Sequence, residues 1–310
     1  MHKHTQMKFN IILVMLALIV LTPLYILLFF SGNQQRDYNI KQVLTNGQSL
    51  IKIAAIEEQG KINQIKEDLI IFSKLPFIKE FDTQRCNDQF AELLKISQAY
   101  ANIGVLDRNG NLLCSGVQFV PGTINAADRT YFINAKTTDS FSVGEYQIGK
   151  VTNKATVNFG YPLYEPDGAF KGVIYIALDL NWMNNYLEQL DLPEGSIVSV
   201  VDHRGTVISS IKDSAYKTGD KPALDFLDML LMDKKGGQAE NESYYFFYTP
   251  LTTLSTTPLH LIVGLNKHTI VAEFDQILSS NLTVLVIAPI LSISLVLFLG
   301  QRFRPAFTAK

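Results

Sequence analysis

The sequence predicts an α+β fold, in which a long N-terminal helix carries two antiparallel-sheet subdomains and a transmembrane helix flanks the fold at each end. Uncharged apolar runs occupy residues 11–30 and 282–300, and each has about the 20 residues that a helix needs to cross a bilayer core. Helical periodicity follows the first run, and one hairpin pattern occurs twice in the region between the runs. These observations together predict the fold class.

The charges beside the two apolar runs predict how the chain is oriented. Lys3 and Lys8 precede the first run, and Arg302 and Arg304 follow the second, as expected of cytoplasmic flanks. The first run is longer than the apolar part of a signal peptide and no small-residue cleavage site follows it, so we favour an anchor over a cleaved signal. We therefore expect a two-pass membrane protein whose central region lies outside the cytoplasm; in a bacterium, this corresponds to the inner membrane with the central region in the periplasm.

The composition fits one folded region between two membrane anchors. The formal net charge of −2 provides no basic surplus for binding nucleic acid. No Pro-, Gly- or Ser-rich tract divides the central region as a flexible linker would. The expected segments are a cytoplasmic tail (1–8), a transmembrane helix (9–31), a long stalk helix (32–84), a membrane-distal subdomain (85–190), a membrane-proximal subdomain (191–266), an exit helix (267–280), a second transmembrane helix (281–300) and a cytoplasmic stub (301–310).

Periodicity and turn residues predict the elements of the central region in order. Apolar residues recur at spacings of three and four from Ile40 to Phe72, which is typical of a long helix with one buried face. Further helices are expected at 90–97, 129–136, 182–190 and 270–278, and strands at 141–147, 155–163, 172–178, 197–201, 206–211, 244–249 and 259–265.

The repeated hairpin pattern covers Val105–Ser115 and Val200–Ser210. Each copy is an apolar strand, an Asp-x-x-Gly turn and a second apolar strand. Asp bonds the backbone of such a turn and Gly supplies a positive φ. The recurrence indicates two copies of one α+β unit, although chance recurrence of a common hairpin is the alternative.

Strand alternation predicts which side chains face an enclosed space in the first copy. Asn158 lies on the polar face of its strand, and Tyr175 and Asp179 on the next strand share that face. Asp179 also precedes a predicted helix, so capping of that helix is the alternative role.

The chain has two cysteines, Cys86 and Cys114, and both fall in the exported region. A disulfide is favoured over two free thiols in an oxidising compartment. A zinc site normally needs four clustered ligands, and no histidine lies near this pair in the sequence.

Motifs of catalysis are weak. A Ser-x-x-Lys at 209–212 and Lys-Thr-Gly at 217–219 lie too close together for the penicillin-binding fold. His203, His260 and His268 lack the spacing of metal ligands. We therefore expect no enzyme activity, catalytic residue, metal or cofactor in this chain.

Four segments resemble the extracytoplasmic double Cache sensor family: Asp128–Phe132, Gly144–Gly149, Tyr161–Leu163 and Gly172–Leu180. The resemblance extends over roughly residues 33–280, and the Cys86–Cys114 pair is similar to that of a subgroup found in front of diguanylate cyclase or histidine kinase outputs. It implies two PAS-like units on one long helix, with a small ligand bound in the distal unit.

The resemblance places Arg129 at the position of the family's ligand-binding arginine, whose planar fork suits a carboxylate or another anion. A structural ion pair of Arg129 with Asp128, Glu145 or Asp179 is the alternative. No aspartate lies within 146–152, where amino-acid-binding members supply one, which argues against an α-amino acid ligand. The candidate ligand-binding residues are Arg129, Tyr131, Phe132, Tyr146, Asn158, Tyr175 and Asp179.

The expected function is therefore a membrane-anchored sensor of small ligands, forming a homodimer through its long first helix. The sequence after residue 300 is too short for an output domain. Any enzymatic output, most simply a diguanylate cyclase or histidine kinase, would lie beyond residue 310 or on a partner protein. Input to a chemoreceptor and a ligand-free scaffold or adhesion domain are the alternatives.

Overall fold

The computed structural model describes residues 2–189, 192–211, 216–222, 227, 235–251, 257–270 and 272, and single positions between 287 and 298. The chain divides into two units, one of residues 1–45 with 268–310 and one of residues 46–267. Nearly all of the expected exit helix, second transmembrane helix and C-terminal stub lies outside the described residues. In the part of the chain that is described, no helix combines the length and apolar character needed to cross a bilayer.

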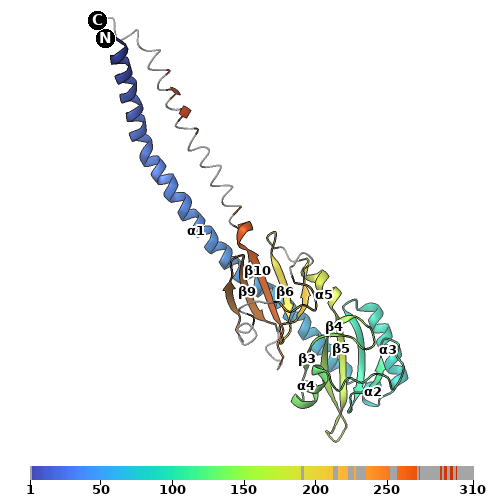
Figure 1. Cartoon of the computed structure of the whole chain (residues 1–310). Coiled ribbons are helices and arrows are strands. Elements are labelled where there is room, and N and C mark those ends of the chain that lie inside the picture. Colours follow the sequence, from blue (N-terminus) through green and yellow to red (C-terminus); the bar gives the residue numbers. More distant parts are fainter. Residues whose placement is uncertain are drawn as a thin grey trace. The chain divides into compact units, whose positions relative to one another are not determined.

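Three helices precede the first strand (Figure 1): α1 (His2–Ser73), α2 (Pro76–Lys79) and α3 (Thr83–Ile96). Because α1 ends at Ser73, the stalk helix expected over residues 32–84 extends too far at its C-terminal end. Leu75 has φ −65° and ψ 137°, an extended conformation, and Pro76 begins α2. A proline disfavours helical backbone at the residue before it, which explains why the long helix ends here.

The C-terminal part of α1 buries one face, as its periodicity predicts. Among the buried residues are Ile51, Ala54, Ile62, Ile65 and Leu69. The hydroxyl of Tyr100, at the start of β1, donates to Asp68 Oδ2 at 2.7 Å and joins α1 to the first sheet.

Two five-stranded antiparallel sheets contain all the strands of the described residues. The first has the order β2-β1-β5-β4-β3 and the second β7-β6-β10-β9-β8, so both have the same topology. The strands of the first sheet are β1 (Tyr100–Asp107), β2 (Leu112–Ser115), β3 (Ser142–Ile148), β4 (Ala155–Tyr164) and β5 (Phe170–Asp179). Those of the second are β6 (Ile197–Val201), β7 (Val207–Ser210), β8 (Gly237–Glu240), β9 (Tyr244–Pro250) and β10 (His260–Asn266).

The repeated hairpins form β1–β2 and β6–β7, at corresponding places in the two sheets. Asp107 Oδ1 accepts hydrogen bonds from two backbone amides of its turn, and Asp202 Oδ1 does the same in the second copy. Gly110 and Gly205 have φ values of 83° and 76°, in the region that favours glycine. The predicted duplication of one α+β unit is confirmed.

Helix α4 (Thr130–Thr138) lies between β2 and β3 in the chain, and α5 (Leu180–Leu187) follows β5. Cys86 of α3 and Cys114 of β2 form a disulfide, with their Cα atoms 6.0 Å apart. The bond ties α3 to the hairpin at the edge of the first sheet.

Candidate ligand-binding site

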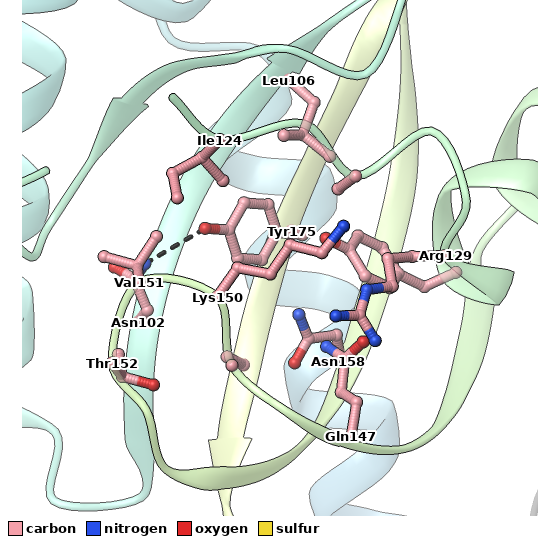
Figure 2. Close-up of a pocket in the computed structure, with 14 residues that line it drawn as sticks. Asn102, Leu106, Ile124, Arg129, Gln147, Lys150, Val151, Thr152, Asn158 and Tyr175 are labelled. Carbon is pink, nitrogen blue, oxygen red and sulfur yellow. Dashed lines mark hydrogen bonds between the residues drawn. The ribbon is translucent and has the colours of Figure 1, made fainter. Parts of the chain in front are cut away.

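A pocket opens on the first sheet, beside the start of α4 and the loop of residues 149–154 that connects β3 to β4 (Figure 2). It encloses about 400 Å³ of empty space, which includes space open to solvent. The lining residues are Asn102, Leu106, Ile124, Ala126, Arg129, Tyr131, Gln147, Gly149, Lys150, Val151, Thr152, Asn158, Tyr175 and Ala177.

The floor of the pocket is formed by alternating residues of neighbouring strands. Asn158 of β4 is paired with Ala177 of β5, and Gly160 of β4 is paired with Tyr175. Because side chains alternate between the faces of a strand, Asn158, Tyr175 and Ala177 all point into the pocket. The predicted shared face of Asn158 and Tyr175 is confirmed.

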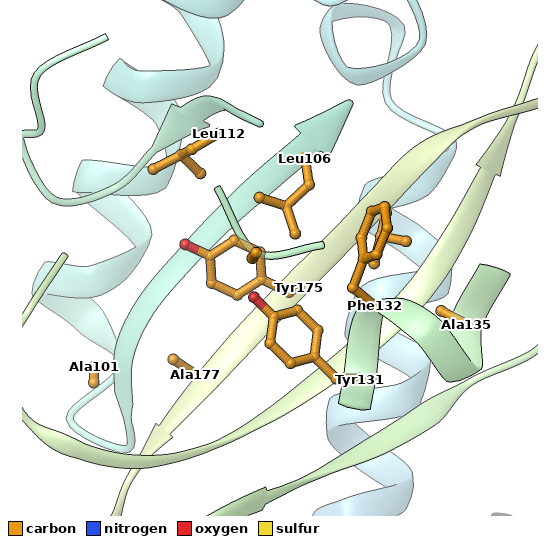
Figure 3. Packing of buried hydrophobic residues seen from close by; sticks show 10 residues of the cluster. Ala101, Leu106, Leu112, Tyr131, Phe132, Ala135, Tyr175 and Ala177 are labelled. Atoms are coloured by element: carbon orange, nitrogen blue, oxygen red, sulfur yellow. The ribbon is translucent and has the colours of Figure 1, made fainter. Parts of the chain in front are cut away.

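Two buried tyrosines form an aromatic wall. The ring centroids of Tyr131 and Tyr175 are 5.6 Å apart, and both rings belong to the apolar cluster on the first sheet (Figure 3). Asn102 Nδ2 donates to the Tyr175 hydroxyl at 3.1 Å. Burial raises the pKa of Tyr131 and of Tyr175 above the ordinary value of a phenol, so both rings stay neutral at physiological pH.

Arg129 stands at the start of α4, as its N-cap residue, and its side chain is 24% exposed. Figure 2 shows its guanidinium pointing towards Asn158 and Gln147. Arg129 Nε lies 3.9 Å from Asp128 Oδ1, a long contact with a carboxylate that also binds Lys150. Among the described residues, no hydrogen bond engages the guanidinium, so its fork remains available to an anion.

The loop of residues 149–154, which we call the lid loop, is held over the pocket by Lys150. Lys150 Nζ donates to Asp128 Oδ1 at 2.9 Å and to the Asn125 carbonyl at 2.8 Å. The hydrogen bond from Lys150 lowers the pKa of the Asp128 carboxyl. Inside the loop, the Asn153 amide donates to the Gly149 carbonyl, and Asn153 has a positive φ of 53°.

Asn158 presents an unused acceptor to the pocket. Its side chain is 4% exposed, and its Oδ1 is buried without a hydrogen-bond partner in the described structure. An unpaired buried acceptor is costly, so this oxygen favours a ligand that brings a donor.

Three of the expected site residues lie away from the pocket lining. Phe132 is buried in the apolar cluster, with its ring centroid 6.3 Å from that of Phe170. Asp179 Oδ2 accepts from Lys154 Nζ at 2.7 Å, and its Oδ1 accepts from the Asn181 amide at the start of α5. The capping role considered for Asp179 is therefore observed.

Tyr146 lies outside the lining because β3 contains a bulge. Val143 pairs with Phe159 and Tyr146 with Val157, so three steps along β3 match two along β4. The extra residue reverses the alternation and turns Gln147, in place of Tyr146, towards the pocket.

Sequence reasoning missed several polar lining residues, chiefly Asn102, Gln147, Lys150 and Thr152. Asn102 is a polar residue within an otherwise apolar strand, a signal that could have been used. The lid-loop residues carry no comparable signal, since a connection between two strands is commonly polar. The described residues contain no group of His, Cys, Asp or Glu side chains that could hold a metal ion.

The family model described as Cache domain, dCache_1, matches residues 27–274. The chain belongs to this family, whose members are extracellular sensor domains of membrane receptors. A comparison with curated proteins gives no match.

Solved structures with the same fold come from several receptor classes. The extracellular domain of a protein assigned as the histidine kinase rpHK1S-Z16 is 18% identical, with a TM-score of 0.60 over 75% of this chain and 98% of that one. A domain of a protein assigned to the sensory box/GGDEF family in Vibrio parahaemolyticus is 14% identical, with a TM-score of 0.57 over 75% and 99%. The ligand-binding domain of the Campylobacter jejuni chemoreceptor Tlp3, in complex with L-valine, is 12% identical, with a TM-score of 0.54 over 76% and 97%.

Proposed function

We propose that this chain is the input module of a bacterial membrane receptor, which binds a small anionic ligand in the distal pocket. The observation that carries the proposal is the convergence of Arg129 with two tyrosines and Asn158 around one enclosed space. A guanidinium beside aromatic walls can bind a carboxylate through paired, charge-assisted hydrogen bonds. Family membership and the valine complex of the Tlp3 domain support a small-molecule ligand.

The contacts of β3 support a route for the signal between the two subdomains. Gln147 of β3 lines the pocket, and the preceding residue Tyr146 donates its backbone amide to Asp202 Oδ2 at 3.1 Å. Glu145 Oε2 lies 2.8 Å from Arg204 Nε. A ligand that shifts Gln147 would therefore act directly on the turn between β6 and β7.

We further propose that the chain crosses the inner membrane twice, with the sensor in the periplasm. The apolar runs at 11–30 and 282–300 and their basic flanks support this topology. The output that follows is a diguanylate cyclase or a histidine kinase, in the same polypeptide or on a partner. The exposed side chains of Ile53 and Ile56 on α1 support a homodimer that packs along this helix.

A thermal-shift screen of the full chain with small carboxylates, amines and nucleobases tests the proposed function. A ligand stabilises the folded state by RT ln(1 + [L]/Kd) and raises the melting temperature. With the best compound, Arg129→Ala should weaken binding by at least about 1.5 kcal/mol, the lower range for a hydrogen bond to a charged group.

Arg108→Ala is the matched control. Arg108 belongs to the same subdomain but lies outside the pocket lining and pairs with Glu165 at 3.7 Å. It should leave the affinity unchanged. Equal effects of the two substitutions, or no stabilising compound in any class, would reject the proposed site.

A further inference from the structure

We propose that the pocket takes a small hydroxycarboxylate, an acid that carries a hydroxyl group and no ammonium group. The inference rests on the proposed function and adds the chemical class of the ligand. Three features carry it: the charge balance of the pocket, the unused oxygen of Asn158 and the apolar surface beside them.

The charge balance selects an anion. Arg129 and Lys150 line the pocket, whereas none of its lining residues is Asp or Glu. The carboxylate of Asp128 is the ion-pair partner of both cations: its Oδ1 lies 2.9 Å from Lys150 Nζ and 3.9 Å from Arg129 Nε. One positive charge is left over beside a partly buried space, and a carboxylate on the ligand compensates it.

The unused oxygen of Asn158 selects a donor on the same ligand. Asn158 Oδ1 is buried and has no hydrogen-bond partner in the described structure, and Asn158 lines the pocket. A carboxylate has only acceptors, so it cannot satisfy this oxygen. A hydroxyl group on the ligand can bond Asn158 while the carboxylate occupies Arg129.

An ammonium group could also donate to Asn158, but the charges oppose it. It would add a positive charge to a pocket that already has one in excess and whose lining offers no carboxylate. Asp179, on the same strand face as Tyr175 and Ala177, is held by Lys154 and by the first turn of α5. The site therefore discriminates against amino acids.

The remaining surface suits a short carbon skeleton. The rings of Tyr131 and Tyr175 and the methyl group of Ala177 provide apolar contact next to Arg129 and Asn158. Figure 2 shows Arg129, Asn158 and the ring of Tyr175 beside Lys150 of the lid loop.

Matched triplets of acids test the inference, because the members of each triplet differ at one substituent. Lactate, alanine and propionate share three carbons, glycolate, glycine and acetate share two, and malate, aspartate and succinate share four. Isothermal titration of the full chain should give the tightest binding for a hydroxy acid. Its affinity should exceed that of the unsubstituted acid by about fivefold or more, and that of the amino acid by about tenfold or more.

Substitutions at Asn158 provide a second test of the inferred ligand class. Asn158→Leu should make the hydroxy acid and the unsubstituted acid bind equally, since the acceptor is gone. Asn158→Asp should shift the preference towards the amino acid, because it adds the missing carboxylate. Tyr131→Phe is the matched control: it removes a neighbouring hydroxyl from the pocket lining but retains the Asn158 acceptor, so the preference for a hydroxy acid should survive. Melting curves of each variant report whether it folds.

The outcomes separate this inference from the proposed function. Tightest binding of an amino acid, abolished by Arg129→Ala, would leave the sensor function standing and overturn the hydroxycarboxylate. Equal affinities of a hydroxy acid and its unsubstituted partner would also overturn it. If none of these acids binds in an Arg129-dependent way, the hydroxycarboxylate is overturned, and the thermal-shift screen decides the sensor function separately.

Discussion

The backbone amide of Tyr146 donates a hydrogen bond to the carboxylate of Asp202, with an N–O distance of 3.1 Å. The bond joins the bulged edge strand of the first sheet to the hairpin turn of the second. Asp202 is 1% exposed and also holds its own turn through Oδ1. One buried side chain thus fixes a turn and joins two subdomains.

Asp202→Asn should lower the free energy of unfolding by about 1–3 kcal/mol, because its amide nitrogen would face the Tyr146 N–H and leave a buried donor unpaired. Asp107→Asn is the matched control from the first hairpin, where Oδ2 accepts only from Asn111 Nδ2 and the turn is exposed. Its effect should be smaller. Urea denaturation of both variants measures the two losses in the free energy of unfolding. Equal losses would indicate that the Tyr146–Asp202 hydrogen bond between the sheets does not contribute to stability.

The disulfide is expected to be intramolecular and important for stability. Intact protein should be lighter by about two mass units before reduction than after it, which mass spectrometry detects. Replacing both Cys86 and Cys114 by serine should destabilise the fold by about 3–4 kcal/mol, since the bond closes a loop with a sequence separation of 28. Thiols that react with an alkylating reagent before reduction would contradict the expectation.

The lid loop depends on the left-handed conformation of Asn153, whose φ is 53°. Asn153→Ala should cost about 1 kcal/mol of stability, because alanine tolerates this region less well than asparagine, and it should weaken ligand binding by loosening the loop. Asn153→Gly tolerates the same φ and serves as the control. Calorimetric titration and urea denaturation test both variants; a glycine variant as impaired as the alanine variant would point to the lost amide side chain instead.

Buried tyrosines predict a loss of stability at alkaline pH. The pKa values of Tyr131 and Tyr175 are raised in the folded state by burial, so folding favours their protonated form. Their contribution is complete below about pH 10, the pKa of a phenol in the unfolded chain, and declines as pH rises above it. The decline amounts to at most about 1.4 kcal/mol per pH unit for each ring.

Urea denaturation between pH 8 and 11 measures this slope, with phenolate absorbance as a second signal. Replacing Tyr131 and Tyr175 together by phenylalanine should reduce the slope. Tyr38→Phe is the control, since it removes a phenol from a residue that is 68% exposed. Phenolate absorbance from all tyrosines near pH 10 in the folded protein would contradict the prediction.

The sequence predicted the repeated hairpins and the face of Asn158 because these rest on local rules. Asp and Gly at fixed turn positions and strict strand alternation are visible in a single chain. The position of Tyr146 rests on a feature that local rules do not give: the bulge between Val143 and Tyr146 forms only in the assembled sheet, and it brings Gln147 into the pocket lining in place of Tyr146.

Other parts of the structure depend on contacts that no local pattern reveals. Strand β8 has the sequence Gly-Gln-Ala-Glu, which lacks β-branched and aromatic residues, and it pairs only with β9 at the sheet edge. Lys150 joins the site through hydrogen bonds to Asn125 and Asp128, more than twenty residues earlier in the chain. The end of α1 differs, because the sequence does contain a local signal for it. Pro76 disfavours helical backbone at Leu75, but the helical periodicity led to the longer expected helix of residues 32–84.

The strand order has a consequence for the timing of folding during export. In each sheet the last strand of the sequence, β5 or β10, lies between an early hairpin and a later one. Neither sheet can close until that strand arrives, because among the strands that the structure describes β5 and β10 alone join the hairpins on either side of them. The ligand pocket is therefore complete once Asp179 has emerged, whereas the second sheet must wait for His260–Asn266. A chain whose synthesis stopped after β9 and before β10 would have a complete ligand pocket in the first sheet, while the β6–β7 and β8–β9 hairpins of the second sheet would not yet be joined.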